Sequence, residues 1–341
     1  MMGEFELIQR FFTRPTPPDT QGVVLGIGDD CALLQPTPGM QLAISSDMLV
    51  CGRHFFAYVD PRALGHKALA VNLSDLAACG ARPLAFTLAL ALPEADAAWL
   101  EPFSQGLLAL ADEHGCALIG GDTTRGPLNI CITVFGEVPA RSGGAGVPTQ
   151  ALLRSGARPG DDVYVSGTLG DARLALEALQ GRIHLPPEVL APARARLEWP
   201  TPRVALGLAL LGVASAAADV SDGLLGDLGH ILERSGVGAT LDTTFAMHLL
   251  AAYADYTGAR ARFEQEIGEK KGLQCVLSGG DDYELVFTAP VAQRAAVHAA
   301  ALASGTPVAC IGQIEATSGL RLVDAQGALL ARDFASFDHF A

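Results

Sequence analysis

The chain has 341 residues, of which 50% are hydrophobic and 18% charged, and its formal net charge is −14. This length and composition allow a large buried core, which excludes wholesale disorder and suggests two domains of ordinary size. The negative charge, without any run of Lys and Arg, argues against nucleic acid or an anionic membrane as a partner.

Helical and strand-like patterns alternate along the first 140 residues, which is typical of an α/β fold. Short apolar runs predict strands at 23–28, 31–35, 41–46, 84–92, 117–121 and 129–138. Two longer segments, Asp60–Cys79 and Ala95–His114, have the pattern of helices. The first has Pro61 in its first turn and Gly80 at its end, as helices often do.

The composition changes abruptly at residues 141–150, whose sequence is RSGGAGVPTQ. Such a stretch of Gly, Ser, Pro and Thr is typical of a loop between domains. We therefore predict an N-terminal domain over residues 1–140, a linker loop over 141–150 and a C-terminal domain over 151–341.

The second half alternates in the same way and predicts a layered α/β domain. Its predicted strands lie at 162–166, 216–220, 273–277, 283–288, 307–311 and 319–323. Its predicted helices lie at 171–181, 187–197, 202–211, 223–234 and 291–304. No repeat of fixed period is evident in either half.

The seven cysteines are odd in number, scattered and without a CxxC pair. This usage indicates a reducing compartment and argues against a zinc site. The N-terminus is acidic and amphipathic, unlike a signal peptide, and the apolar stretches at 83–92 and 204–220 suit a membrane span poorly. We expect a soluble, cytoplasmic protein.

One feature recurs: an apolar segment runs into small residues and then into Asp. The motifs are LGIGDD, LAISSD, VNLSD, ALIGGD, AADVSDG and VLSGGDD. Any one of them could be only a turn or a helix N-cap. Asp75 is harder to explain in that way, because its surroundings are apolar and a bare buried charge is costly. So many acids without matching Lys or Arg motifs favour a cation cluster over ion pairs.

The chemistry of these acids indicates the cation. Oxygen ligands without paired His or Cys favour Mg²⁺, Mn²⁺ or Ca²⁺, and the calcium-loop spacing is absent. Mg²⁺ usually takes one or two carboxylates and fills its other positions with water and substrate phosphate. Several Mg²⁺ ions on dispersed Asp residues therefore imply a polyphosphate substrate. The common nucleotide motifs GxxxxGK[ST], GxGxxG, HRD and DFG are missing, so another fold must handle it.

The order of the motifs resembles thiamine-monophosphate kinases from end to end. The segments that carry the resemblance are GEFELIQRFF, GIGDDCALL, HKALAVNLSDLAACGARP, GGDTTRGP, RSGARPGDDVYVSGTLGD, DVSDGLLGDLGHI, SGGDDYELVFT, CIGQI and DHF. The resemblance implies a PurM-like, two-domain α/β (α+β) build. An N-terminal mixed sheet with helices would bind ATP and Mg²⁺ and form a homodimer, and a C-terminal α/β domain would complete the site. The implied reaction is transfer of a phosphoryl group from ATP to thiamine monophosphate, by direct in-line transfer assisted by several Mg²⁺ ions.

The resemblance also implies residue roles. Magnesium positions fall on Asp30, Ser45, Ser46, Asp47, Asp75, Asp122, Asp219 and Asp222, and five of these, Asp30, Asp47, Asp75, Asp122 and Asp219, are the expected catalytic acids. ATP positions fall on Gly121, Asp122, Arg154 and Ser221, and thiamine monophosphate positions on His54, Asp281 and Phe337. Ser46 stands where Thr is expected, Asp281 where Glu is common, and Phe337 where Tyr or Trp is frequent.

Two alternatives remain open at the level of the sequence. The chain could be another ATP-using enzyme of the same superfamily, such as selenophosphate synthetase, although no reactive Cys precedes GIGDD. It could also be a non-catalytic protein that binds divalent cations or nucleotides. Metal binding without ATP consumption would favour the second alternative.

Overall fold

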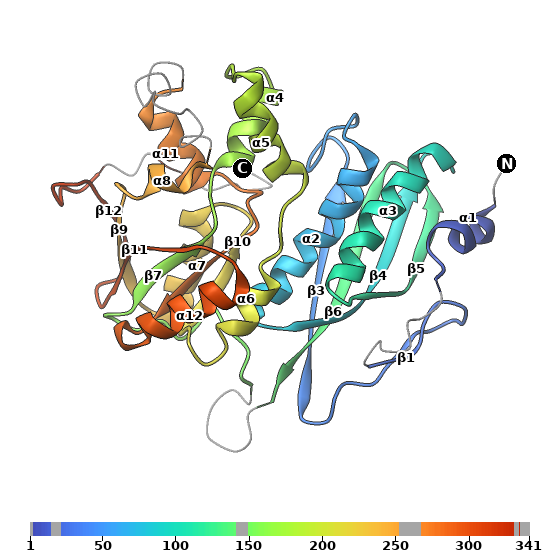
Figure 1. Cartoon of the computed structure of the whole chain (residues 1–341), viewed down its shortest axis with the longest axis horizontal. Helices are drawn as coiled ribbons and strands as arrows, with labels where there is room; N and C mark the ends of the chain where they lie inside the picture. The colour runs from blue at the N-terminus through green and yellow to red at the C-terminus, as the bar shows by residue number, and fades with distance from the viewer. Residues whose placement is uncertain (1–2, 15–21, 141–148, 252–266, 331–333, 335–341) are drawn as a thin grey trace. The chain divides into compact units, whose positions relative to one another are not determined.

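A computed structural model describes residues 3–14, 22–140, 149–251, 267–330 and 334 (Figure 1). The chain divides into two compact units. The first comprises Met1–Leu76 and Ala81–Ala151, and the second comprises Ala77–Gly80 and Leu152–Ala341. The predicted linker falls next to this division, but residues 141–148 lie outside the described part.

The first unit contains three helices and six strands among its described residues. The helices are α1 (Glu4–Phe11), α2 (Pro61–Cys79) and α3 (Ala97–Glu113). The strands are β1 (Val23–Leu25), β2 (Leu33–Leu34), β3 (Met40–Val50), β4 (Arg82–Leu92), β5 (Ala117–Arg125) and β6 (Asn129–Pro139). β1 pairs with β2, and the other four form a mixed sheet in the order β3-β6-β4-β5.

Helices α2 and α3 cover one face of the four-stranded sheet (Figure 1). Nearly all of α2 is buried, as its apolar sequence predicts. The two helices touch backbone to backbone, since a Cβ at Gly65 would lie 2.0 Å from the Phe103 carbonyl oxygen and one at Gly106 would lie 1.9 Å from that of Arg62. Glycine at both positions therefore allows the helices to approach closely.

The second unit contains six strands in one sheet, in the order β12-β9-β11-β7-β10-β8. The strands are β7 (Asp162–Ser166), β8 (Ala216–Val220), β9 (Gly238–Asp242), β10 (Glu284–Ala289), β11 (Val308–Glu315) and β12 (Gly319–Val323). The described helices are α4 (Asp171–Leu179), α5 (Pro187–Glu198), α6 (Val204–Ala209), α7 (Leu224–Ser235), α8 (Ala246–Leu249), α11 (Glu269–Ser278), the 3₁₀ turn η1 (Val291–Gln293) and α12 (Arg294–Ser304). Every residue of β7, β8 and β10 is buried, so this end of the sheet is covered on both faces.

Two predictions for the second unit were wrong. Residues 273–277 are not a strand but part of α11, because a short buried apolar run fits a helix as well as a strand and its length alone does not decide. The strand β9 was missed. Its sequence, GATLD, has little of the β-branched or aromatic character of a strand, and it forms between β11 and β12 through tertiary pairing.

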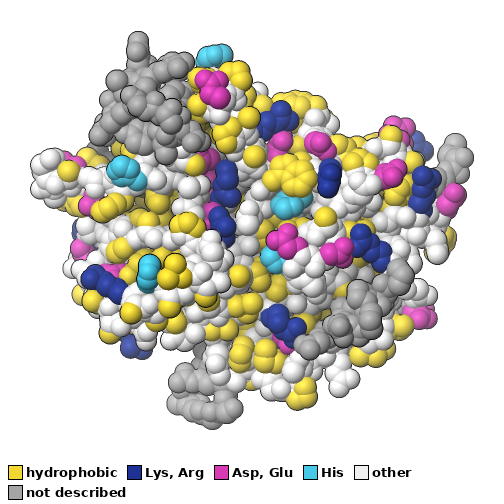
Figure 2. Space-filling model, in the orientation of Figure 1, with side chains coloured by type: hydrophobic (Ala, Val, Ile, Leu, Met, Phe, Trp, Pro, Cys, Tyr) yellow, Lys and Arg dark blue, Asp and Glu magenta, His cyan; other side chains and the backbone are white. Residues whose placement is uncertain are grey.

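The remaining global features concern thiols, membranes and surface charge. All seven cysteines are free thiols. No helix within the described ranges combines the length and the apolar character needed to cross a membrane. On the face in Figure 2, the Lys and Arg side chains that are drawn in colour lie scattered among Asp and Glu and form no continuous patch.

Candidate active site

The SSD motif of β3 faces helix α2 with two of its three residues. Asp75 accepts a hydrogen bond of 2.5 Å from the Ser45 hydroxyl. One turn earlier on α2, the Asn72 side-chain oxygen accepts a 3.0 Å hydrogen bond from the Asp47 backbone N–H. Because β3 is an edge strand, this N–H needs a partner outside the sheet, and α2 supplies it. Asp75 and Asn72, three residues apart on one helix face, thus fix the position of the SSD backbone.

Ser46 lies on the opposite face of the sheet, because successive strand residues alternate. Its hydroxyl is 3.0 Å from that of Thr133 and donates to the Ile132 carbonyl at 3.1 Å. The motif that the sequence presents as one cluster is therefore divided between two faces of the sheet.

A cavity of about 840 Å³ brings other predicted acids together. Asp29 and Asp30, from the loop after β1, and Asp122 of β5 all line it. The consecutive glycines Gly120 and Gly121 line the same wall. Helix α1 forms another wall, through residues that include Phe5 and Ile8. The cavity therefore combines three carboxylates, two consecutive glycines and a helix wall that carries both apolar and polar side chains, which is a chemistry suited to a nucleotide.

The predicted acids of the first unit do not form one cluster. Asp47 lies on the edge strand β3, whereas Asp122 lies on β5 at the other edge of the four-stranded sheet. Within the described ranges, no three His, Cys, Asp or Glu side chains are close enough to hold a metal ion by themselves. Mg²⁺ needs only one or two protein carboxylates when it arrives with phosphate and water, so this dispersed set of oxygen donors fits Mg²⁺ better than a metal that needs a complete protein cage.

His54 lies in the turn after β3 and is half-buried. Its Nδ1 accepts a 3.0 Å hydrogen bond from the Val50 backbone N–H. In the neutral imidazole the hydrogen is therefore on Nε2, which makes that nitrogen a donor.

In the second unit, the DVSDG motif forms a tight turn between β8 and α7. One oxygen of Asp227 accepts three hydrogen bonds of 3.1 Å each, from the backbone N–H groups of Ser221, Asp222 and Gly223. Burial and the neighbouring Asp222 carboxylate raise the pKa of Asp227 to about 7, and the three N–H donors act in the opposite direction. Asp227, to which the sequence assigned no role, thus determines the shape of this turn.

The SGGDDYE loop packs directly on that turn. The Asp281 N–H donates to the Ser221 carbonyl at 2.9 Å, and a Cβ at Gly280 would lie 2.2 Å from the same oxygen. Asp281 has a φ of 70° and Tyr283 a φ of 51°, a conformation that is unfavourable for residues other than glycine. Backbone strain of this kind tends to occur at functional sites, and it holds Asp281 against Ser221 here.

The structure also places the remaining predicted residues. Arg154 is exposed in a loop that Ser235 holds, because the Ser235 hydroxyl accepts from Gly156 and Ala157 and donates to the Arg154 carbonyl at 3.2 Å. Asp219 is buried near the end of β8, opposite Leu285. Phe337 lies outside the described residues.

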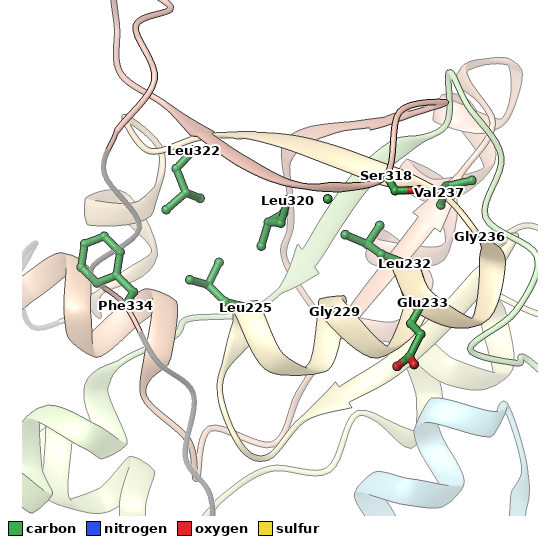
Figure 3. Close-up of a pocket in the computed structure, with 11 residues that line it drawn as sticks. Leu225, Gly229, Leu232, Glu233, Gly236, Val237, Ser318, Leu320, Leu322 and Phe334 are labelled. Carbon is green, nitrogen blue, oxygen red and sulfur yellow. The ribbon is translucent and has the colours of Figure 1, made fainter.

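The second unit has another cavity, of about 520 Å³, between α7 and β12 (Figure 3). Leu225, Leu232, Leu320, Leu322 and Phe334 line it with apolar atoms. Glu233 is the charged residue of its lining, and its carboxylate points away from the leucines in Figure 3. A cavity with so little converging polar chemistry is a weak candidate for phosphate binding.

Sequence reasoning missed two kinds of residue. The α1 residues belong to the GEFELIQRFF segment, but no ligand-binding pattern distinguished them. Asp29 was visible as the first acid of GIGDD, yet only the cavity shows that it lines the same space as Asp122.

Comparisons with known proteins agree with this architecture. The family model of AIR synthase related proteins matches with its N-terminal domain over residues 28–138 and with its C-terminal domain over 158–325. These two domains, in this order, define the class of protein and confirm the predicted PurM-like fold.

More specific relatives are thiamine-monophosphate kinases. That of Salmonella typhimurium is 46% identical over 99% of this chain and 98% of its own. The crystal structure of the Stenotrophomonas maltophilia enzyme is 46% identical, with a TM-score of 0.79 over 94% of this chain and 96% of that one. AaThiL complexed with AMPPCP and TMP is 26% identical, with a TM-score of 0.72 over 99% and 97% of the two chains. The chain belongs to the thiamine-monophosphate kinase family, and it is an enzyme of the kinase class.

Proposed function

We propose that the protein transfers the γ-phosphoryl group of ATP to thiamine monophosphate and so forms thiamine diphosphate and ADP. The observation that carries the proposal is the cavity of the first unit, where Asp29, Asp30 and Asp122 adjoin the Gly120–Gly121 strand. The family's members and the AaThiL complex with AMPPCP, an ATP analogue, and TMP support this choice of substrates.

The proposed roles follow the sequence motifs. Magnesium would be held by Asp30, Ser45, Ser46, Asp47, Asp75, Asp122, Asp219 and Asp222. ATP would contact Gly121, Asp122, Arg154 and Ser221, and thiamine monophosphate would contact His54, Asp281 and Phe337. When bound, magnesium would neutralise the repulsion between the two phosphates.

The chain's own residues would mainly position the reactants. Thiamine monophosphate is already ionised near neutral pH, so its phosphate needs no general base. His54 can donate from Nε2 to an anionic oxygen, since Nδ1 is occupied by Val50. The strained Asp281 carboxylate would face the cationic, aminopyrimidine-bearing substrate, and Phe337 would stack on it. A raised KM for thiamine monophosphate in Phe337→Ala tests the stacking.

Transfer would be direct and in line, without a phosphoenzyme. No side chain among the described site residues is needed as a nucleophile when the acceptor carries its own anionic oxygen. Mixing the protein with ³²P-labelled ATP alone tests this step, because a labelled protein would contradict it.

We also propose that the protein is a cytoplasmic homodimer. In β3, Leu42, Ile44 and Met48 alternate onto the face opposite α2 and are exposed by 40%, 60% and 52%. An apolar stripe of this size on an edge strand favours burial by a second copy.

The decisive experiment measures ADP and thiamine diphosphate together, from ATP and Mg²⁺ with and without thiamine monophosphate. We expect equal amounts of both products, and neither without the acceptor. ADP without thiamine diphosphate would point to another acceptor of the superfamily. Metal or ATP binding without turnover would support a non-catalytic binding protein.

A further inference from the structure

Residues 154–161, with the sequence RSGARPGD, form a loop of the second unit that leads into β7. Arg154, the first residue of this loop, is exposed. Within the described ranges, the Arg154 guanidinium takes part in no hydrogen bond or ion pair, in a chain with 37 Asp and Glu against 23 Lys and Arg. A long side chain without a partner has many conformations, so its reach toward a ligand depends on how firmly its backbone is held.

A single hydroxyl from a distant helix holds this backbone. The Ser235 Oγ accepts hydrogen bonds from the N–H groups of Gly156 at 3.1 Å and Ala157 at 3.2 Å. The same hydroxyl donates to the Arg154 carbonyl at 3.2 Å. A serine hydroxyl offers one donor and two acceptor positions, so the loop uses all of them. Ser235 nevertheless lies 81 residues from Arg154 in the sequence.

The loop is also fixed on either side of these bonds. Just before it, the Leu153 carbonyl accepts a 3.0 Å hydrogen bond from the Ala217 N–H of β8. Toward its end, Asp161 accepts a 3.0 Å hydrogen bond from the Arg158 N–H. Between these two points, all the hydrogen bonds that the loop makes within the described part of the chain go to Ser235. Without that hydroxyl, the intervening backbone would be held only at its ends.

Helix α7 carries a side chain that holds a loop at each of its ends. In its first turn, Asp227 accepts from the Ser221 N–H, and its last residue is Ser235. The two held segments contain Ser221 and Arg154, which are the proposed ATP contacts of the second unit. Because hydrogen bonds along its whole length make a helix stiff, α7 fixes the backbones of these two residues relative to each other.

We propose that Ser235 is a positioning residue for ATP, because its hydroxyl holds residues 154–157 so that the Arg154 guanidinium can meet an anionic oxygen of the nucleotide. The inference rests on the proposed function, which gives Arg154 its contact with ATP. Ser235 itself would not touch ATP. Its contribution would be to order the loop before binding, so that less conformational entropy is lost when ATP binds.

Calorimetry with Mg²⁺ and AMPPCP measures the nucleotide affinity of the full chain without turnover. Ser235→Ala should raise the dissociation constant about threefold or more, because binding must then also order the loop and the Arg154 side chain. The KM for thiamine monophosphate should stay unchanged. Ser304→Ala is the matched control and should leave both constants unchanged. Ser304 is the last residue of α12, and its hydroxyl donates to the Ala301 carbonyl of the same helix at 3.2 Å.

A double-mutant cycle separates positioning from stability. Arg154→Ala should raise the dissociation constant about tenfold or more, as loss of a hydrogen bond from a charged group does. Adding Ser235→Ala to this variant should raise it no further, because Ser235 acts through Arg154. Urea titration records the stability of each variant. A purely structural Ser235 would lower the free energy of unfolding and leave the affinity of the folded chain unchanged.

The outcomes separate the inference from the proposed function. An unchanged dissociation constant in Ser235→Ala, or an equal loss with and without the Arg154 side chain, would overturn the inference alone. An unchanged dissociation constant in Arg154→Ala would remove Arg154 from the ATP site and overturn the inference with it, while the proposed reaction stands. A wild type that binds no nucleotide would overturn the proposed function itself.

Discussion

Asp122 contributes a carboxylate to the cavity without being buried. Asp122→Asn keeps the shape of the side chain and removes the charge, so we expect an intact fold and a loss of turnover of at least about a hundredfold. Asp112→Asn is the control, because Asp112 is an exposed acid in α3, paired only at the surface with Arg14 at 2.7 Å. Thiamine diphosphate formation and the unfolding midpoint are measured for both variants, and near-normal turnover in Asp122→Asn would remove it from the site.

Asp282, next to the strained Asp281, is completely buried. One of its oxygens accepts a 2.8 Å hydrogen bond from the Gly170 N–H at the start of α4, and its other oxygen has no hydrogen-bond partner. Burial raises its pKa well above the ordinary value, partly offset by the Gly170 N–H. The folded protein is therefore more stable with Asp282 protonated and neutral than with Asp282 ionised.

This raised pKa predicts a pH dependence of stability. A group with a raised folded pKa stabilises the fold below its unfolded pKa, and that stabilisation is lost as pH rises through the folded pKa. Asp282→Asn is neutral at every pH and keeps an acceptor for Gly170. Its denaturation midpoint should therefore fall less than that of the wild type as the pH is raised above the ordinary pKa of Asp, about 3.9. Asp324→Asn, in an exposed turn, should follow the wild type, and equal slopes for all three proteins would contradict the prediction.

The conformation of the DVSDG turn at the start of α7 depends on Asp227. Asp227→Ala removes the acceptor of three backbone N–H groups, which should lower stability by about 1–2 kcal/mol. It should also lower kcat by about tenfold or more, because Ser221 and Asp222 lose their fixed positions. Asp242→Ala is the control. Asp242 accepts from the Thr244 N–H at 2.9 Å in another turn, so its loss should affect stability without kcat.

Helix α5 is tied to β10 by a buried ion pair. Glu284 is fully buried, and its carboxylate accepts from Ser166 at 2.6 Å, from Arg196 at 2.7 Å and from Arg203. Removing a partner of a buried carboxylate destabilises the folded protein, because the buried charge is then left without compensation.

The contribution of this ion pair to stability can be measured with substitutions of two arginines of α5 that are two residues apart. Arg196→Leu leaves Glu284 with fewer partners and should lower the free energy of unfolding by about 1–3 kcal/mol. Arg194→Leu loses only a pair with Glu198 on the helix surface and should cost less than about 0.5 kcal/mol. Urea titration of both variants measures the difference, and equal costs would show that the buried pair adds nothing.

The proposed homodimer would bury the exposed apolar side chains of β3. Ile44→Asp combined with Met48→Asp places two charges on the apolar stripe of β3, and a charge buried without a partner disrupts an interface. We expect light scattering to show two chains per particle for the wild type and one for the variant. Leu302→Asp, at a 70% exposed position of α12, should leave the dimer unchanged. A monomeric wild type, or a dimeric double variant, would contradict the proposal.

Local sequence patterns predicted much of the secondary structure and the types of residue in the candidate site. Asp75, in its apolar helix, was predicted to need a partner, and the Ser45 hydroxyl bonds to it. Long apolar segments correctly predicted α2 and α3, and short apolar runs correctly predicted the buried strands β7, β8 and β10, because residues buried in a core are mostly apolar. The acids and the glycines between them predicted a phosphate-handling site, because carboxylates can hold Mg²⁺ and Mg²⁺ also binds phosphate oxygens.

Tertiary structure decided which of these residues meet. Pairing of β8 with β10 brings Asp281 to Ser221 across some sixty residues of chain, and strand alternation divides Ser46 from Ser45 and Asp47. The position of α1 beside Gly120 has no local signal either. The segment 273–277 became a helix for the same reason. Contacts between distant segments depend on burial and pairing across the whole fold, and a local pattern cannot specify these.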